Sequence, residues 1–400
     1  MEQIAKRLFN WASILEPNTR EQAEKTASMP FVWPHLALMP DAHLGKGATV
    51  GSVIPTLGAI MPAAVGVDIG CGMMAVLIQL TADDVRRRGD LDKLRETIET
   101  VIPLSAGKYN GAFYSLRTDH RAAVLGNMEG SESADRVAPN WNLQLGSLGS
   151  GNHFIEISLD ELDRVWLFLH SGSRGVGNKL AVHHIKIAQQ QCERRWISLP
   201  DPDLAYLVEG DPEFWEYLRD LRWAQYFALL NREEMMMRVK NCVAAWCGQD
   251  VQELEAVNCH HNYTEQMTGE LLGRWKRPKG AHGHVWLSRK GAIDATEGMP
   301  GLIPGSMGTR SYVVTGLGSP LSLNSSPHGA GREYSRSAAR KTFTRDQLDA
   351  AMEGIEWGRS DAFLDEIPGA YKPIDVVMAD AADLVEVKHT LRQIVNVKGD

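Results

Sequence analysis

The residues of this sequence that could do chemistry stand in short glycine-rich segments. The segment GVDIGCGM places Asp68 and Cys71 three residues apart among three glycines. Such a turn lets a carboxylate oxygen and a thiolate converge on one point, where a divalent cation would keep the thiol deprotonated. The alternative interpretation is a buried turn with an inert cysteine.

Several histidines stand in similar surroundings. Asn152 and His153 precede an expected strand in GSLGSGNHFIEI, and His170 ends the segment VWLFLH. Consecutive side chains of an extended segment point to opposite faces, so we expect only one of His260 and His261 in a site. One carboxylate, one thiolate and several imidazoles are the ingredients of a metal centre formed by tertiary convergence. The alternative is a set of unrelated core and surface histidines.

A second group of residues suits phosphate chemistry. In NSSPHGAGREYSR, the histidine is followed by small residues and two arginines: His328, Gly329, Ala330, Gly331, Arg332 and Arg336. An exposed imidazole there could act as a nucleophile toward a phosphate whose charge the guanidinium groups hold. A turn with solvated arginines is the alternative.

Standard metal and nucleotide motifs do not occur in the sequence. It has no CxxC pair, no HExxH and no GxxxxGK[ST], and its GSRGVG segment is too short for a dinucleotide fingerprint. The sequence motifs that usually indicate a structural zinc site or a zincin protease are therefore absent. Any nucleotide must be bound by something other than a P-loop or a dinucleotide-binding turn.

Strands and helices that alternate along the chain must position these segments. Short strands and tight turns are expected in FVWPHLALMPDAHLGKGATVGSVIPT, where His43 and Lys46 could line a site. Buried strands are predicted at 165–170 and in SYVVTG. The stretch from Gly107 to Gln144 has no clear period and predicts a polar surface segment.

Capping residues and apolar periodicity predict the helices. One helix is expected to begin near Asn18, one lies within 81–102 with Asp90 as its cap, and one follows the turn SGSRGVGN. A long helix is expected from Asp211 and Pro212 to about Trp246, and another from Thr344 to Gly358.

Composition gives the class of protein. The 400 residues are 44% hydrophobic and 23% charged, with a formal net charge of -8, which indicates a globular chain without broad non-specific nucleic-acid binding. The basic clusters at 86–88 and 274–279 are more consistent with solvated surface than with RNA contacts. Five scattered cysteines, no export signal and no membrane-spanning segment predict a cytoplasmic protein without a membrane partner.

The same segments carry a family resemblance. MPDAHLGKGATVGSVIPT, AAVGVDIGCGM, GSLGSGNHFIEI, LHSGSRGVGN, NCHHNY, RKGA, IPGSMGTRSYVV, HGAGREYSR and HTLRQIVNVKG occur in this order over nearly the whole chain. They resemble the RtcB family of GTP-dependent RNA ligases. The resemblance implies one mixed α/β catalytic domain over residues 1–400, with central mixed β-sheets flanked by helices and a central metal-binding cleft.

The resemblance also implies a reaction and a set of residues. An RNA end with a 3'-phosphate or 2',3'-cyclic phosphate would be joined to a 5'-hydroxyl end, with GTP and two Mn2+ ions, in tRNA splicing or RNA repair. His328 would be guanylylated, and the metal ligands would be Asp68, Cys71, His153, His170 and His261. The guanylate would be held by Asn152, Phe154, Glu156, Ser306, Gly329, Ala330, Gly331 and Lys398. Arg174, Arg332 and Arg336 would bind RNA phosphates.

Physical chemistry agrees with these implied roles. Two cations sharing a thiolate can neutralise a triphosphate, and a carboxylate such as Glu156 can accept from the N1 and N2 donors of guanine, which adenine lacks. Two alternatives stay open: a binuclear metal-dependent phosphodiesterase without a covalent intermediate, and a binding protein that keeps the fold. The physiological RNA and any archease-type activator are also open, since the segment 107–145 is short and has little basic character.

Overall fold

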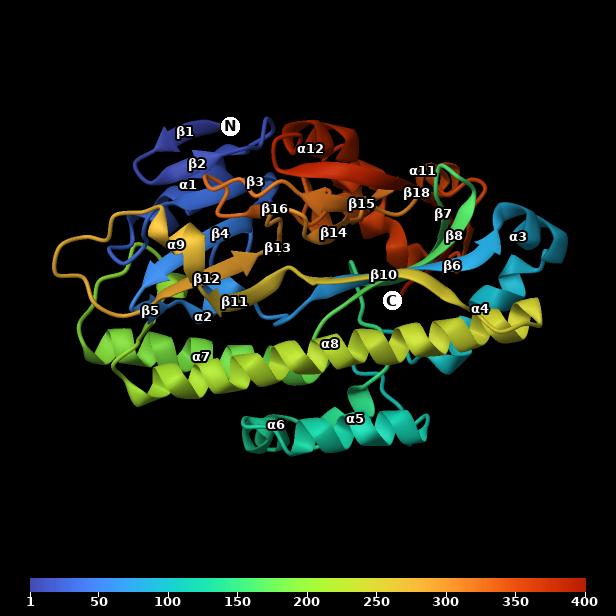
Figure 1. Cartoon of the computed structure of the whole chain (residues 1–400), viewed down its shortest axis with the longest axis horizontal. Coiled ribbons are helices and arrows are strands. Elements are labelled where there is room, and N and C mark those ends of the chain that lie inside the picture. Colours follow the sequence, from blue (N-terminus) through green and yellow to red (C-terminus); the bar gives the residue numbers. More distant parts are fainter.

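The computed structural model describes residues 1–400 and confirms a mixed α/β fold, built on two large sheets (Figure 1). The first sheet has the order β1-β2-β3-β4-β12-β11, in which only β2 and β3 run parallel. Its strands are β1 (Glu2–Ala5), β2 (Leu8–Asn10), β3 (Leu36–His43), β4 (Val50–Leu57), β12 (Val285–Lys290) and β11 (Asn262–Gln266).

The second sheet has the order β10-β6-β8-β7-β18-β15-β14, and β17 adds to β18 in parallel. Its strands are β10 (Glu253–His260), β6 (Gly72–Thr81), β8 (Arg164–Ser171), β7 (Phe154–Leu159), β18 (Val385–Val397), β15 (Ser311–Gly316), β14 (Pro300–Ile303) and β17 (Glu356–Trp357). Two short pairs complete the strands: β13 (Ala292–Asp294) with β16 (Ser325–Pro327), and β5 (Ala59–Ile60) with β9 (Leu207–Val208).

Successive side chains of a strand point to opposite faces of the sheet. On the central strands both of these faces are buried, each in a different core cluster. On β8, Trp166 and Phe168 join a core cluster that also contains residues of the first sheet, such as Met39 and Val53. The alternate residues Leu167 and Leu169 join a second cluster with side chains of the long helix α8. The continuous apolar run at 165–170, which predicts a buried strand, is therefore confirmed.

Helices cover the second sheet on that other face. The long helix α8 runs beside α7 along one side of the molecule, and α5 and α6 lie outside them (Figure 1). The helices are α1 (Pro17–Ser28), α2 (Pro62–Val65), α3 (Ala82–Arg88), α4 (Leu91–Val101), α5 (Leu116–Gly126), α6 (Ser131–Val137), α7 (Arg174–Arg194), α8 (Pro212–Cys247), α9 (Gly269–Gly273), α10 (Arg336–Thr342), α11 (Arg345–Ala351) and α12 (Ile374–Asp380). None of them combines the length and the apolar character that crossing a membrane would require.

Several predictions from local patterns were wrong, and one is that α7 begins at Arg174, inside the segment SGSRGVGN that was expected to be a turn before the helix. The stretch from Gly107 to Gln144 contains α5 and α6, whose short apolar faces pack in the cluster around α7 and α8. The first helix begins at Pro17 with Glu16 as its N-cap, and Asn18 bonds only the adjacent amide. The helix behind Thr344 ends at Ala351, well before Gly358. By contrast, the capping box of Thr344 with Gln347 is confirmed.

Candidate active site

The strand register of the second sheet brings the predicted metal-binding segments to one edge. Gly72 at the start of β6 lies opposite both Ser171 at the end of β8 and His260 at the end of β10. Phe154 at the start of β7 lies opposite His170. Since these four strands are neighbours, the residues next to their ends come together although they lie far apart in the sequence.

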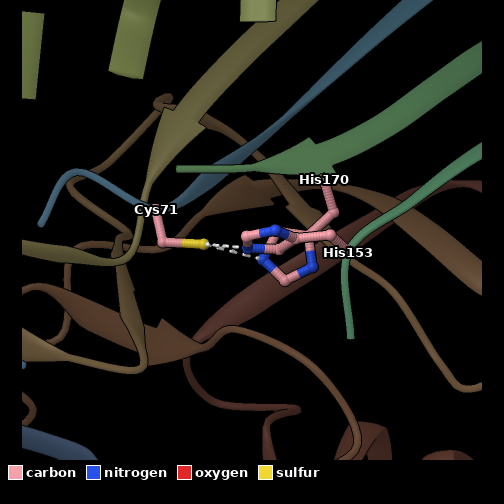
Figure 2. A group of neighbouring side chains, drawn as sticks. All are labelled: Cys71, His153 and His170. Carbon is pink, nitrogen blue, oxygen red and sulfur yellow. Dashed lines mark hydrogen bonds between the residues drawn. The ribbon is translucent and has the colours of Figure 1, made fainter. Parts of the chain in front are cut away.

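One sulfur atom lies at the centre of these strand ends. Sγ of Cys71 is 3.3 Å from Nε2 of His153 and 3.2 Å from Nε2 of His170, and Figure 2 shows both rings pointing toward it. Nε2 of His153 is also 3.0 Å from a carboxylate oxygen of Asp68. Nε2 of His261 is 2.9 Å from Nε2 of His170. Cys71, His153 and His170 lie close enough together to hold one metal ion, and Asp68 and His261 extend this group of potential ligands on either side.

The protonation of these residues fits cation binding. Nδ1 of His170 donates to the carbonyl oxygen of Asn152 at 3.1 Å, which leaves the lone pair of Nε2 directed at Cys71. Burial lowers the pKa values of His170 and His261 well below the usual range, so both rings are neutral, as ligands must be. Burial and the neighbouring Asp68 raise the pKa of the Cys71 thiol well above its usual value. A divalent cation would supply the positive charge that a thiolate needs there.

The turn that carries Asp68 fits tightly against the segment after β8. The backbone N–H of Ser173 donates to Oδ1 of Asp68 at 3.1 Å, and a Cβ on Gly172 would lie only 2.2 Å from that oxygen. Although burial alone would raise the pKa of Asp68, its hydrogen bond with His153 lowers it, so the carboxylate is ionised. The residues present therefore suit divalent cations bound through oxygen, nitrogen and sulfur.

His328 faces this group of ligands. It follows β16, and its ring centroid is 4.5 Å from that of His261. Oδ2 of the fully buried Asp41, on β3, accepts from Nδ1 of His328 at 2.6 Å and from its backbone N–H at 3.1 Å. Because a carboxylate oxygen only accepts, Nδ1 carries a proton, and in the neutral ring Nε2 of His328 then has the free lone pair. This is the arrangement of a nucleophile oriented by a carboxylate.

A cavity of about 320 Å³ connects His328 to the ligand group. Its lining includes most residues predicted to bind metal or guanylate: Asp68, Cys71, His170, His261, Asn152, Phe154, Glu156, Ser306, His328, Gly329, Ala330, Gly331 and Lys398. His153 is buried behind Cys71 and does not line the cavity.

Glu156 has unused hydrogen-bonding capacity in this cavity. It accepts from Nδ2 of Asn396 at 3.2 Å through Oε1, whereas its buried Oε2 has no partner. Burial raises the pKa of Glu156 to about 8. A buried carboxyl oxygen without a partner is costly, so a ligand with N–H donors would be favoured at this position.

The three arginines predicted to bind RNA phosphates lie in different surroundings. Arg174 begins α7 beside His153, and a Cβ on Gly149 would come within 2.6 Å of its guanidinium. Arg332 also lines the cavity, and its guanidinium makes four hydrogen bonds within the protein, donating to Tyr334, Glu366, Tyr371 and Asp365. Arg336 lines the cavity with its side chain 51% exposed, and it is therefore freer to meet a phosphate.

Helix α8 holds the ligand-bearing segments from behind. The buried guanidinium of Arg232 donates to the carbonyl oxygens of Gly70 at 2.9 Å and Ser171 at 3.1 Å, and to Nδ1 of His260 at 3.0 Å. These acceptors adjoin Cys71, His170 and His261 in sequence. Consistent with the expected alternation, His260 points to Arg232 while His261 points to the cavity.

Sequence reasoning did not identify several residues of the site. Asp41 stands in MPDAHLGKG, a segment in which the sequence predicts site residues only at His43 and Lys46. Both of these residues line the cavity. Lys290 stands in the RKGA segment and lines it too, and burial lowers its pKa to about 7. No local pattern distinguishes Arg232 from the other charged residues of a long helix.

Comparison with known proteins gives the family. Residues 22–399 match the family described as tRNA-splicing ligase RtcB. The chain belongs to the RtcB family of RNA ligases. It is 45% identical to the RNA-splicing ligase RtcB of Escherichia coli K12, over 96% of this chain and 95% of the relative. It is also 29% identical to the tRNA-splicing ligase RtcB of Pyrobaculum aerophilum, over 98% of this chain and 94% of that protein. These findings confirm the predicted family and enzyme class.

Proposed function

We propose that this RtcB-family protein joins an RNA end bearing a 3'-phosphate or 2',3'-cyclic phosphate to a 5'-hydroxyl end, using GTP. The observation that carries the proposal is the pair of Asp41 and His328 beside the Cys71 group in one cavity. A nucleophile free to accept a nucleotidyl group and ligands for cations that bind phosphates are the two parts that such a ligase needs.

Cations are proposed at two positions that share Cys71. Asp68 and His153 would complete one ligand set, and His170 and His261 the other. Mn2+ accepts this mixture of oxygen, nitrogen and sulfur ligands. Bound divalent ions would neutralise phosphate charge and act as Lewis acids.

The reaction proposed has three displacements at phosphorus. Nε2 of His328 attacks the α-phosphorus of GTP and pyrophosphate leaves, while Asp41 holds the proton on Nδ1. An oxygen of the RNA 3'-phosphate then takes GMP from His328. Finally the 5'-hydroxyl oxygen attacks the 3'-phosphate, GMP leaves, and the phosphodiester forms. A cyclic end is first hydrolysed to a 3'-monophosphate.

The cavity residues would select and hold the nucleotide. Glu156 would accept from N1–H and the N2 amino group of guanine, and the cationic Lys398 lies close enough to affect its pKa. Asn152, Phe154, Ser306 and the backbone of residues 329–331 line the same cavity and would hold the rest of the guanylate. Arg174 and Arg336 would bind RNA phosphates, whereas Arg332 would brace the site through Glu366.

The proposal extends to the organisation and setting of the protein. Residues 1–400 would act as one catalytic domain, because the cavity is lined by residues from His43 to Lys398. A cytoplasmic location would provide both the RNA and the reducing conditions that a thiolate ligand requires. An archease-type activator is a further expected partner.

Incubation with Mn2+ and GTP labelled at the α-phosphate tests the central step. We expect label that survives denaturation of the wild-type protein and is absent from His328→Ala, and ligation of RNA by the wild type alone. Cleavage of phosphodiesters without any covalent label would instead identify a metal-dependent phosphodiesterase and overturn the proposal.

A further inference from the structure

Residues 268–284 form a basic loop between β11 and β12. This segment, TGELLGRWKRPKGAHGH, contains four Lys or Arg side chains and one acidic side chain, in a chain whose net charge is -8. Arg274 pairs with Glu270, the one acidic residue of the loop. Lys276, Arg277 and Lys279 are exposed, and no carboxylate lies within 4.0 Å of them.

The loop is held in place at both ends. Leu271, Leu272 and Trp275 pack against the core, and the Trp275 ring contacts that of His35 edge-on, with centroids 5.0 Å apart. At the other end, the backbone N–H of His284 donates to Glu209 at 2.7 Å. An anchored loop therefore carries these cations, and within it Arg277 donates to the carbonyl oxygen of Gly283 at 3.0 Å.

The loop contrasts with the other cluster of basic residues. On α3, Arg86, Arg87 and Arg88 each lie within 3.7 Å of an aspartate. Their charges are largely compensated at the surface, as is usual for a solvated helix face. Of these two clusters, the loop at 274–279 is the one that presents three cations without a carboxylate partner, which favours a role beyond solubility.

Strand geometry relates this loop to the active site. Asn262, next to His261, pairs with Lys290 at the cavity end of the hairpin, and Gln266 pairs with Trp286 at the other end. The four steps from Asn262 to Gln266 span about 13 Å at roughly 3.3 Å each. The loop leaves from the far end of the hairpin, where it projects beyond α9 at the left of Figure 1.

The chemistry of this surface favours phosphates over a protein partner. No large hydrophobic residue of the loop is exposed, since Leu271, Leu272 and Trp275 are partly buried. A protein interface usually needs an apolar or aromatic centre. A phosphodiester backbone needs only cations for binding. A double helix that extends from the active site to the loop would offer roughly one phosphate per 1.7 Å of its axis.

We propose that Lys276, Arg277 and Lys279 bind the backbone of the RNA substrate about 13 Å or more from the ends being joined. The inference rests on the proposed function for the identity of the substrate. The loop would thus favour RNAs whose body extends beyond the reacting ends, and it would add affinity without adding sequence specificity.

The test compares two triple variants that remove the same charge. K276Q/R277Q/K279Q neutralises the loop, and R86Q/R87Q/K93Q neutralises three exposed, paired cations near α3 as the matched control. Binding is measured at several salt concentrations with an RNA stem of about 20 base pairs that ends in a 3'-phosphate. We expect the loop variant to bind about 10-fold or more weakly at low salt, with the slope of log Kd against log salt reduced by about 2 to 3.

Further measurements separate this surface from the ligase chemistry. Guanylylation by GTP without RNA should be unchanged in both variants, and the charge-preserving K276R/R277K/K279R should bind RNA as the wild type does. If the wild type joins no RNA, the proposed function fails, while the binding comparison still decides the role of the loop. Equal RNA affinity and equal salt slopes in the loop variant, the control and the wild type would overturn the inference. The inference would be overturned in the same way if the loop bound an acidic protein and not RNA.

Discussion

Oδ2 of Asp41 lies 2.6 Å from Nδ1 of His328, although the two residues are 287 positions apart. Asp41 is fully buried on β3, and its second carboxylate oxygen has no partner. A buried aspartate that accepts from the backbone and the ring of the same histidine fixes both the orientation and the tautomer of that ring. The free Nε2 therefore results from the packing of β3 against the segment after β16.

Replacing this carboxylate should impair the nucleophile. In Asp41→Asn, the side-chain amide can donate to Nδ1 and stabilise the tautomer that carries its proton on Nε2, which is the wrong form for attack. We expect the rate of His328 guanylylation to fall by about 100-fold or more, measured as label from GTP retained after denaturation. Asp375→Asn, at an exposed position, is the control. A normal rate in Asp41→Asn would show that the ring needs no such orientation.

Cys71 should decide the affinity for cations. Cys71→Ser keeps the volume but removes the soft shared ligand, so we expect Mn2+ affinity to fall by about 100-fold or more. Equilibrium dialysis gives this affinity without reference to catalysis. Cys247→Ser, at the end of α8, should bind Mn2+ as the wild type does. Two unchanged Mn2+ sites in Cys71→Ser would contradict the shared-thiol arrangement.

The sequence predicts the chemical parts of this site better than the helices that support it. Glycine-rich segments reveal Asp68, Cys71 and His328, because backbones that approach a ligand closely need small residues. Asp41 is less evident, since its partner lies 287 residues away and only the pairing of distant strands brings them together. Similarly, α5 and α6 form between 107 and 144 because α7 and α8 offer their short apolar faces a partner, and local periodicity cannot reveal that partner.

Glu156 should make guanine binding depend on pH. Burial raises its pKa to about 8, so the carboxyl of the ligand-free protein is mostly protonated at pH 7. Because the carboxylate accepts guanine donors better than the neutral acid, guanosine affinity should rise between pH 6 and 8, by up to about tenfold per unit, and level off above pH 8. Calorimetric titration with guanosine avoids the ionisation of phosphates. Glu156→Gln should bind guanosine more weakly and show a flat profile, and the same slope in both proteins would assign the effect to another group.

Arg232 should set the position of the proposed metal ligands without touching any of their coordinating atoms. Its guanidinium satisfies carbonyl oxygens that are buried next to Cys71 and His170, so Arg232→Met would leave several buried acceptors unpaired. We expect a loss of at least about 3 kcal/mol in the free energy of unfolding, measured with urea, since each buried unpaired group costs roughly 1 to 3 kcal/mol. Arg222→Met, at an exposed position of the same helix, should have little effect on the free energy of unfolding.

Arg232→Lys separates the charge of this residue from its geometry. The lysine keeps the charge but cannot reach all three segments, so the variant should recover part of the stability while its Mn2+ affinity stays below that of the wild type. Full recovery of Mn2+ affinity in Arg232→Lys would mean that the buried charge alone, and not the geometry of the guanidinium, holds the site together.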